Sequence, residues 1–112
     1  MRLAKEGITI VRKALATQRY VEISREIRHA EVRVIERSFY LVLYREEIVV
    51  NDERLPISTV HDVSCYRKRQ DSNEIGFLYL HTTQGTKTLY IREDPAEFIA
   101  AYLKLKGELR NE

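Results

Sequence analysis

The chain has 112 residues, of which 44% are hydrophobic and 32% charged, and its formal net charge is +2. This length fits one globular domain with a buried core, and we predict a single domain over residues 1–112. Acidic and basic residues are interleaved along the sequence, which keeps a protein soluble but does not favour a polyanionic partner.

The N-terminus and the single cysteine indicate in which cellular compartment the protein is expected. Residues 1–6 lack the apolar segment of a secretory signal. No stretch approaches the roughly 20 apolar residues that a membrane-spanning helix needs. Cys65 is the sole cysteine, which excludes an intramolecular disulfide. We therefore predict a cytoplasmic protein without a transmembrane segment.

The C-terminal part carries the signals of an amphipathic helix over about residues 95–106. Asp94 suits the N-cap, Pro95 the first helical position, and Glu97 completes a capping-box-like pair. Gly107 predicts the end of the helix. Four apolar residues recur at helical spacing and predict a buried stripe: Phe98, Tyr102, Leu105 and Leu109.

Upstream of this helix the apolar pattern alternates with period two, which predicts strands. Residues 77–83 and 86–92, separated by Gln84-Gly85, predict a hairpin whose glycine supplies a positive φ. Residues 39–44 and 47–50 predict an earlier hairpin. Further strands are expected over 31–37 and 60–69, and turns over 51–54 and 70–73.

Residues 1–30 allow two interpretations. Short alternations at Ile8 and Ile10, and again at Val21 and Ile23, predict strands. A helical three-four spacing also runs through Tyr20, Ile23, Ile27, Ala30 and Val34, and Ala14-Leu15-Ala16 favours a helix. Periodicity does not decide between the two for segments this short. We favour strands after residue 19 and leave the helix as the alternative.

Two runs of paired strands carry a family resemblance. The first comprises residues 41–44, 47–50, 55–58 and 60–63, and the second comprises a last hairpin, 76–80, 83–85 and 89–91, followed by a closing helix at 94–99. Over residues 31–106 this spacing resembles the pleckstrin-homology (PH)-like superfamily, including its bacterial PH and GRAM-type members. The resemblance implies an α+β, mainly β fold: two orthogonally packed antiparallel sheets forming a barrel or sandwich, closed by the C-terminal α-helix. It also implies binding of lipids, peptides or proteins rather than catalysis.

The residues that could support catalysis or metal binding do not form a recognisable motif. Cys65 needs a base, but His61 lies four strand residues away, roughly 13 Å. His29, His61 and His81 show none of the close spacings of a structural zinc site. We therefore expect no catalytic residue, no metal and no cofactor.

The densest basic run, Arg67-Lys68-Arg69, is the candidate anion-binding site. At a strand end it could meet a lipid head group or a nucleic-acid phosphate. Asp71 and Glu74 follow closely and partly cancel its field, so a solvated strand end is the favoured interpretation.

Seven tyrosines, of which five fall in the predicted strands, raise a second question of nucleic-acid binding. Aromatic side chains on a sheet can stack on bases, but they also pack across strands. Because the net charge is small and no RNA-recognition motif is present, packing is favoured.

These patterns predict a non-catalytic binding module that acts on a protein partner or on a second copy of itself. Edge strands and loops would make the contact, because pairing with an edge needs no signature residues. The alternative is binding of anionic lipid head groups or nucleic-acid phosphates through Arg67, Lys68 and Arg69.

Overall fold

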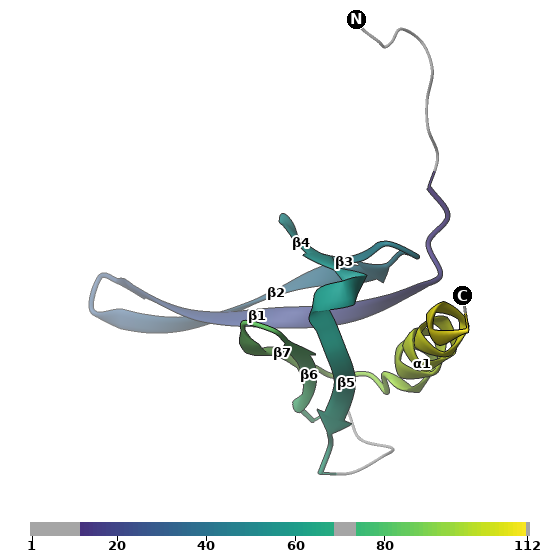
Figure 1. The fold of residues 1–112 in the computed structure, drawn as a ribbon. Helices are drawn as coiled ribbons and strands as arrows, with labels where there is room; N and C mark the ends of the chain where they lie inside the picture. The colour runs from purple at the N-terminus through teal and green to yellow at the C-terminus, as the bar shows by residue number, and fades with distance from the viewer. Residues whose placement is uncertain (1–11, 69–73, 112) are drawn as a thin grey trace, which may run out of the picture.

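The computed structural model describes residues 12–68 and 74–111 of the chain (Figure 1). Seven strands are followed by one α-helix, with a short 3-10 helix, Ile57–Thr59, between the fourth and fifth strands. The elements are β1 Ala16–Arg28, β2 Glu31–Leu43, β3 Glu47–Val50, β4 Glu53–Pro56, β5 Val60–Tyr66, β6 Gly76–Thr82, β7 Gly85–Ile91 and α1 Ala96–Arg110.

The strands form an antiparallel sheet in the order β4-β3-β2-β1-β7-β6-β5. Its two halves meet where β1 pairs with β7, and this contact consists of one residue pair, Val21 with Tyr90. The ladder begins at β4 and ends at β5, so the described sheet is not closed into a barrel. The prediction of a mainly β, antiparallel fold with a C-terminal helix is confirmed.

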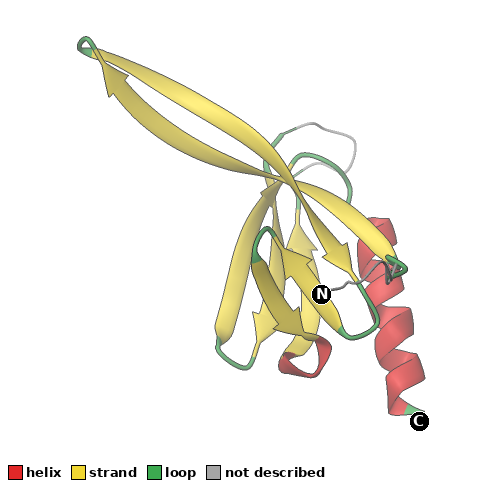
Figure 2. Ribbon diagram, turned by 90° about the horizontal axis from the view of Figure 1, so that it is seen from above, coloured by secondary structure: helices red, strands yellow, loops and turns green. Residues whose placement is uncertain are grey.

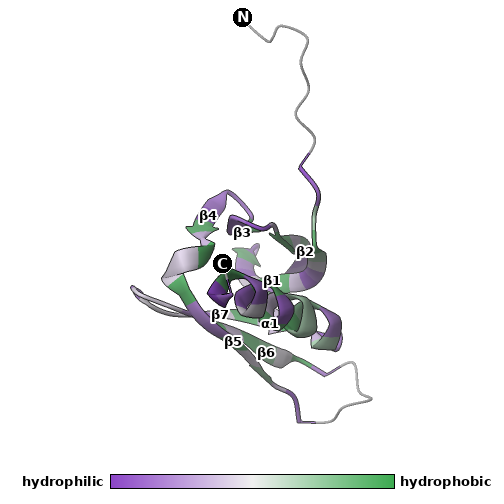
Figure 3. Ribbon diagram, turned by 45° about the vertical axis from the view of Figure 1, so that its right-hand side comes forward, coloured by the Kyte–Doolittle hydropathy of each residue, from purple (hydrophilic) through white to green (hydrophobic). Residues whose placement is uncertain are grey.

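The core lies between the sheet and α1. In Figure 3 the helix is seen nearly end-on beside the strands, with hydrophilic and hydrophobic residues around its circumference. The helix contributes Phe98, Tyr102 and Leu105, which are at most 2% exposed. Fully buried residues of the strands pack opposite them: Leu41, Leu43, Ile48, Val60, Leu78, Leu80 and Ile91.

The helix begins one residue later than predicted, at Ala96, and ends four residues later, at Arg110. The N-cap is Pro95 and not the predicted Asp94, because the Pro95 carbonyl oxygen accepts the hydrogen bond of the Ile99 amide. Asp94 still contributes at this end, since its Oδ1 accepts a hydrogen bond from the Ala96 amide at 3.0 Å. The predicted stop at Gly107 is wrong, because α1 continues to Arg110. Leu109 still packs against the core at this point, and that contact offsets the roughly 1 kcal/mol that a glycine costs inside a helix. No helix in the described parts of the chain has the length and hydrophobicity needed to cross a membrane.

The predicted hairpins are present, but several boundaries differ. The strand predicted over residues 60–69 ends at Tyr66, and Arg67 and Lys68 lie beyond it. Gly85 has the predicted positive φ, 118°, but the turn between β6 and β7 is Thr83-Gln84 rather than Gln84-Gly85, because Gly85 is the first residue of β7 and pairs with Thr82. Residues 31–37 and 39–44, predicted as separate strands, form the single strand β2, because nothing between them breaks the ladder with β1. Glu53 and Arg54, predicted within a turn, belong to β4, since the turn uses only Asn51 and Asp52.

Strand β1 answers the question left open for the N-terminal part. The helical alternative is wrong for Ala16–Arg28, which is extended and paired along its whole length with β2. Pairing of alternating residues with a second strand therefore outweighs the helical three-four spacing. Ile8, Ile10 and the turn predicted over residues 70–73 lie outside the described residues.

Alkaline pH is expected to destabilise the fold through Tyr102. Its buried hydroxyl donates a hydrogen bond to the Val60 carbonyl oxygen at 2.9 Å, and burial raises the pKa of Tyr102 to about 12. An unfolded tyrosine titrates near 10, so the stability from this group is complete below pH 10 and is lost as the pH rises toward 12. The loss should be roughly 2 kcal/mol.

The measurement is the free energy of unfolding in urea at pH 8 and at pH 11.5, for the natural chain and for Tyr102→Phe. The substitution removes the titrating hydroxyl, so the variant should lose less stability between the two pH values. Equal losses in the two proteins would contradict the assignment.

Candidate functional site: a protruding two-stranded arm

The hairpin formed by β1 and β2 is much longer than the strands beside it. Both strands have 13 residues and pair along their whole length. On one side, β3 pairs only with Leu41–Leu43 of β2, and on the other, β7 pairs only with Val21 of β1. Residues 23–36, here called the arm, therefore extend beyond the neighbouring strands, as Figure 2 shows.

A two-residue turn, His29-Ala30, reverses the chain at the tip of the arm. Both residues have a positive φ, of 51° and 65° respectively. Two successive positive φ angles are what a type I′ hairpin turn requires, and asparagine or glycine usually supplies them. Because neither is present, the turn is not predicted from the sequence.

One face of the arm carries two pairs of opposite charges across its strands, followed toward the body by Ser24 opposite Ile35. Arg28 lies opposite Glu31, and Glu26 lies opposite Arg33. Opposite charges placed directly across an antiparallel pair stabilise the pairing. These pairs help the ribbon keep its register where no third strand supports it.

The other face of the arm, here called its apolar face, carries four exposed aliphatic residues together with Arg25 and Glu36. Ile27 lies opposite Val32 near the tip. Val34 lies on the same face, two residues further along β2 toward the body. Their side chains are 75%, 63% and 66% exposed, and Ile23, where the arm begins, is 43% exposed. Several neighbouring exposed apolar residues of this kind mark interaction surfaces in soluble proteins.

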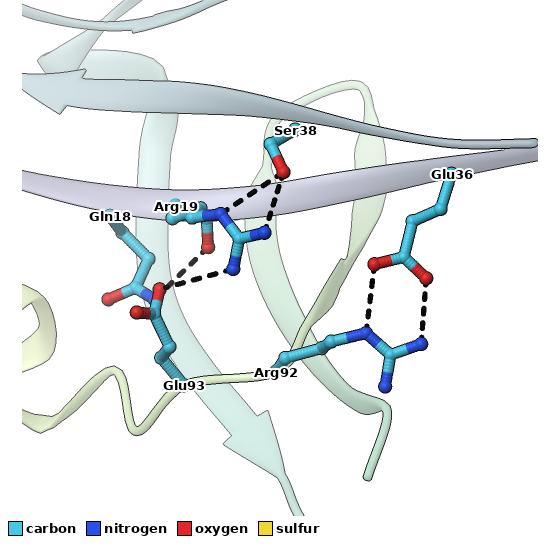
Figure 4. A network of polar contacts seen from close by, with 6 residues as sticks. All are labelled: Gln18, Arg19, Glu36, Ser38, Arg92 and Glu93. Atoms are coloured by element: carbon cyan, nitrogen blue, oxygen red, sulfur yellow. Dashed lines mark hydrogen bonds and ion pairs between the residues drawn. The ribbon is translucent and has the colours of Figure 1, made fainter. Parts of the chain in front are cut away.

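A network of polar contacts fixes the base of the arm to the end of β7 (Figure 4). Glu36 accepts hydrogen bonds from Arg92 at 2.9 Å from Nε and 2.7 Å from Nη2. Nearby, Arg19 donates to the Ser38 hydroxyl at 2.7 and 3.1 Å and lies 3.9 Å from Glu93. The hydrogen bonds from Arg92 lower the pKa of Glu36, so this anchor persists until the pH falls below the ordinary range of a glutamate.

The face that carries the apolar residues of the arm continues across the other half of the sheet as an aromatic row, Tyr90, Phe77 and Tyr66. Tyr90 pairs with Val21 of β1 and with Phe77 of β6, and Phe77 pairs with Tyr66 of β5. The Phe77 ring lies 5.7 Å from Tyr90 and 6.4 Å from Tyr66, between ring centroids. Tyr66 and Tyr90 are 56% and 42% exposed.

A cleft of about 620 Å³ opens where β1 and β7 diverge beyond their single pair. The β3–β4 turn lines one side, and Lys87 contributes an ion pair with Glu53, at 2.7 Å between Nζ and Oε1. Tyr20 also lines the cleft, and burial raises the pKa of its hydroxyl. Among the described residues, those that line the cleft include no histidine or cysteine, and the edges of β1 and β7 diverge along it.

The structure separates the members of the predicted anion-binding run. The Arg67 side chain is only 7% exposed and lies against the start of α1, with its Nη1 3.9 Å from Asp94 Oδ2. Lys68 is exposed, and Arg69 lies outside the described residues. Arg67 thus faces a carboxylate of the same chain. Binding of an anion by these three residues stays a prediction.

Sequence reasoning missed a hydrogen-bonded pair, Ser64 and His81. The Ser64 hydroxyl lies 2.8 Å from His81 Nε2, and His81 Nδ1 lies 3.2 Å from the Thr86 hydroxyl. The pair is visible only when the register of β5 and β6 is known. A nucleophile and its base would be arranged this way, but a threonine occupies the orienting position and neither residue lines the cleft. We therefore interpret it as a cross-strand contact.

The other sequence candidates lie on β5 and at the tip of the arm, and His61 is exposed on β5. Cys65 is exposed on β5, and His29 lies at the tip of the arm. Within residues 12–68 and 74–111, no three His, Cys, Asp or Glu side chains gather as metal ligands.

Comparisons with protein-family models, with curated proteins and with solved structures gave no match to this chain. The resemblance of residues 31–106 to PH-like domains stays a prediction. The arm and the aromatic row are the two surface features that the geometry singles out.

Proposed function

We propose that this chain is a non-catalytic protein-interaction module and that the arm makes the contact. The exposed apolar face of the arm is the observation that carries the proposal. An isolated two-stranded ribbon is at best marginally stable in water. Covering Ile27, Val32 and Val34 would remove apolar surface from water and would stabilise the ribbon together with its partner.

The unpaired edges of the arm support a protein as the partner. Beyond Val21, β1 has no described neighbour on its β7 side, and β2 has none before Leu41 on its β3 side. Backbone amides and carbonyls along such edges can pair with an added strand. By contrast, the outer strand β4 has four residues and ends at Pro56, which has no amide hydrogen to donate.

We also propose that the fold is a variant of the PH-like architecture. Seven antiparallel strands followed by a C-terminal helix support this relationship, and so does the division of the sheet into halves of four and three strands. The single pair between β1 and β7 leaves the seam open. Domains of this architecture act by binding, which agrees with a role for the arm.

Removal of the arm tests the proposed function. Ser24 and Ile35 are directly opposite, and they lie four pairs from Arg28 and Glu31, which flank the natural two-residue turn. Because the two kinds of pair alternate along the ladder, Ser24 and Ile35 are also a hydrogen-bonded pair. Residues 25–34 can therefore be replaced by Asn-Gly, which favours a two-residue hairpin turn. The shortened hairpin keeps Glu36 and its hydrogen bonds to Arg92. We expect cooperative thermal unfolding and a native-like circular dichroism spectrum, together with loss of the proteins that the full chain retains in an affinity pull-down.

The control for this experiment is Ser24→Asp, which leaves the arm in place and changes its charged face. We expect some proteins to be retained by the full chain and by this control but lost with the shortened hairpin. Binding of such a protein depends on the arm. If the full chain, the Ser24→Asp control and the shortened hairpin all retain the same proteins, the proposed function is refuted.

A further inference from the structure

We propose that the partner of the arm is a second copy of this chain, with the apolar face of each arm packed on the aromatic row of the other copy. The inference rests on the proposed function, because it uses the same arm. It adds the identity of the partner and the surface that receives the arm.

The arm and the aromatic row lie on one face of one sheet. Residues paired across antiparallel strands point to the same face, and so do alternate residues along a strand. Val21 pairs with Tyr90, and Ile23 and Ile27 follow Val21 at even spacing. The core residues Leu41 and Leu89 lie on the opposite face, so the arm and the row share the outer face, where Val34 and Tyr66 are more than half exposed. Each surface therefore needs a partner from outside the chain.

These two surfaces hold most of the large exposed apolar residues of the described chain. Four belong to the arm and two to the aromatic row, while Tyr40 lies on the same face of β2. Only Leu15 and Leu103 lie elsewhere. The chain thus presents two exposed apolar surfaces, an aliphatic and an aromatic one, that a second copy could cover at the same time.

The charges of the arm favour a second copy over a polyanion. Residues 23–36 contain three arginines and three glutamates, so the arm has no net charge. A nucleic acid or an anionic membrane would select a basic arm. Arg25 lies on the apolar face, opposite Val34. On the aromatic row of another copy, its guanidinium could stack over a tyrosine ring as a cation–π contact.

The placement of both surfaces on one face allows a closed dimer. When two copies meet through that face about a two-fold axis, the arm of the first lies on the row of the second, and the reverse holds equally. The reciprocal arrangement doubles the contact. This matters because specific interfaces bury on the order of 1,200–2,000 Å² in total, more than one narrow ribbon supplies alone.

The mass of the purified chain in solution tests this inference. Sedimentation velocity from about 1 µM to about 500 µM, the range of weak to moderate dimers, should show a concentration-dependent species of twice the chain mass. A reductant must be present because Cys65 is exposed and could form a disulfide between copies. Circular dichroism and thermal unfolding verify that each variant below is folded.

Matched substitutions locate the interface. Val34→Asp places a carboxylate on the apolar face and should weaken the dimer by about tenfold or more. Ser24→Asp places the same group on the opposite face, at the residue next to Arg25, which pairs with Val34. This control should change the dimerisation constant by less than about twofold. Tyr66→Ser removes an exposed ring of the aromatic row and should also weaken the dimer by about tenfold.

Mixing the two weakened variants tests the reciprocal contact. Tyr66→Ser keeps an intact arm and Val34→Asp keeps an intact aromatic row, so their mixture should form a heterodimer with one complete contact. A dimer weakened by Val34→Asp but not by Tyr66→Ser would overturn the packing of the arm on the row. A chain that is monomeric at all concentrations would overturn the inference entirely, whereas arm-dependent capture of other proteins would still support the proposed function.

Discussion

Replacing Phe98 by alanine is expected to lower the free energy of unfolding by about 3–5 kcal/mol, the cost of removing a large buried aromatic side chain. Phe98 is fully buried and lies in the first turn of α1, where the helix meets the sheet. A domain of this size is typically stable by about 5–15 kcal/mol, so the variant should lose a large share of its stability. Urea unfolding followed by circular dichroism measures the change.

Leu103→Ala is the matched control in the same helix. Leu103 is 55% exposed, so its truncation removes little buried surface and should change the free energy of unfolding by less than about 1 kcal/mol. Similar losses for the two variants would mean that the helix does not cover the core through the face that contains Phe98.

Gly76→Ala is expected to destabilise the fold by about 1–3 kcal/mol, the usual cost of overpacking. A methyl group at this position would lie 2.8 Å from the Tyr66 carbonyl oxygen and 2.7 Å from Arg67 Cγ. The carbonyl belongs to the neighbouring strand β5, so relief requires the backbone to move. The expected result is a lower urea midpoint with an unchanged denaturant slope.

Gly107→Ala should change stability in the opposite direction. Gly107 lies inside α1, and a methyl group there would meet no atom within 4 Å. Alanine is favoured over glycine in a helix by about 1 kcal/mol, so the urea midpoint should rise. Changes of the same sign in both variants would contradict the packing described for β5, β6 and α1.

The core and the arm can therefore be altered separately. Phe98 and Gly76 act on stability through the body of the protein, whereas Val34 lies on an exposed strand of the arm. Because Val34 is 66% exposed, substituting it should affect association much more than folding. Measuring both quantities for each variant distinguishes a lost contact from a lost fold.

Local signals made the C-terminal half predictable. Asp94-Pro95 places the start of α1 to within one residue, and Gln84-Gly85 places the β6–β7 turn to within one residue, because each depends on backbone groups only a few residues apart. The position of Gly107 inside the helix was not predictable, since it depends on Leu109 reaching the core.

The site was less predictable than the fold. Alternating apolar residues such as Ile27 and Val32 normally indicate a buried strand face, and nothing in the sequence marks this face as exposed. The turn at His29-Ala30 lacks the usual residues, which hid the tip of the arm. The composition of the basic run at Arg67 predicted an anion-binding site, yet the Arg67 side chain packs beside Asp94.

The sequence by itself determined the mainly β class, the C-terminal helix and its buried stripe, because periodicity and capping are local properties of the chain. Only the tertiary structure decided where neighbouring strands stop, since strand length beside a partner depends on pairings distant in sequence. The short strand β3 and the single pair between Val21 and Tyr90 leave residues 23–36 without neighbours. Those missing neighbours turn an ordinary hairpin into an exposed arm.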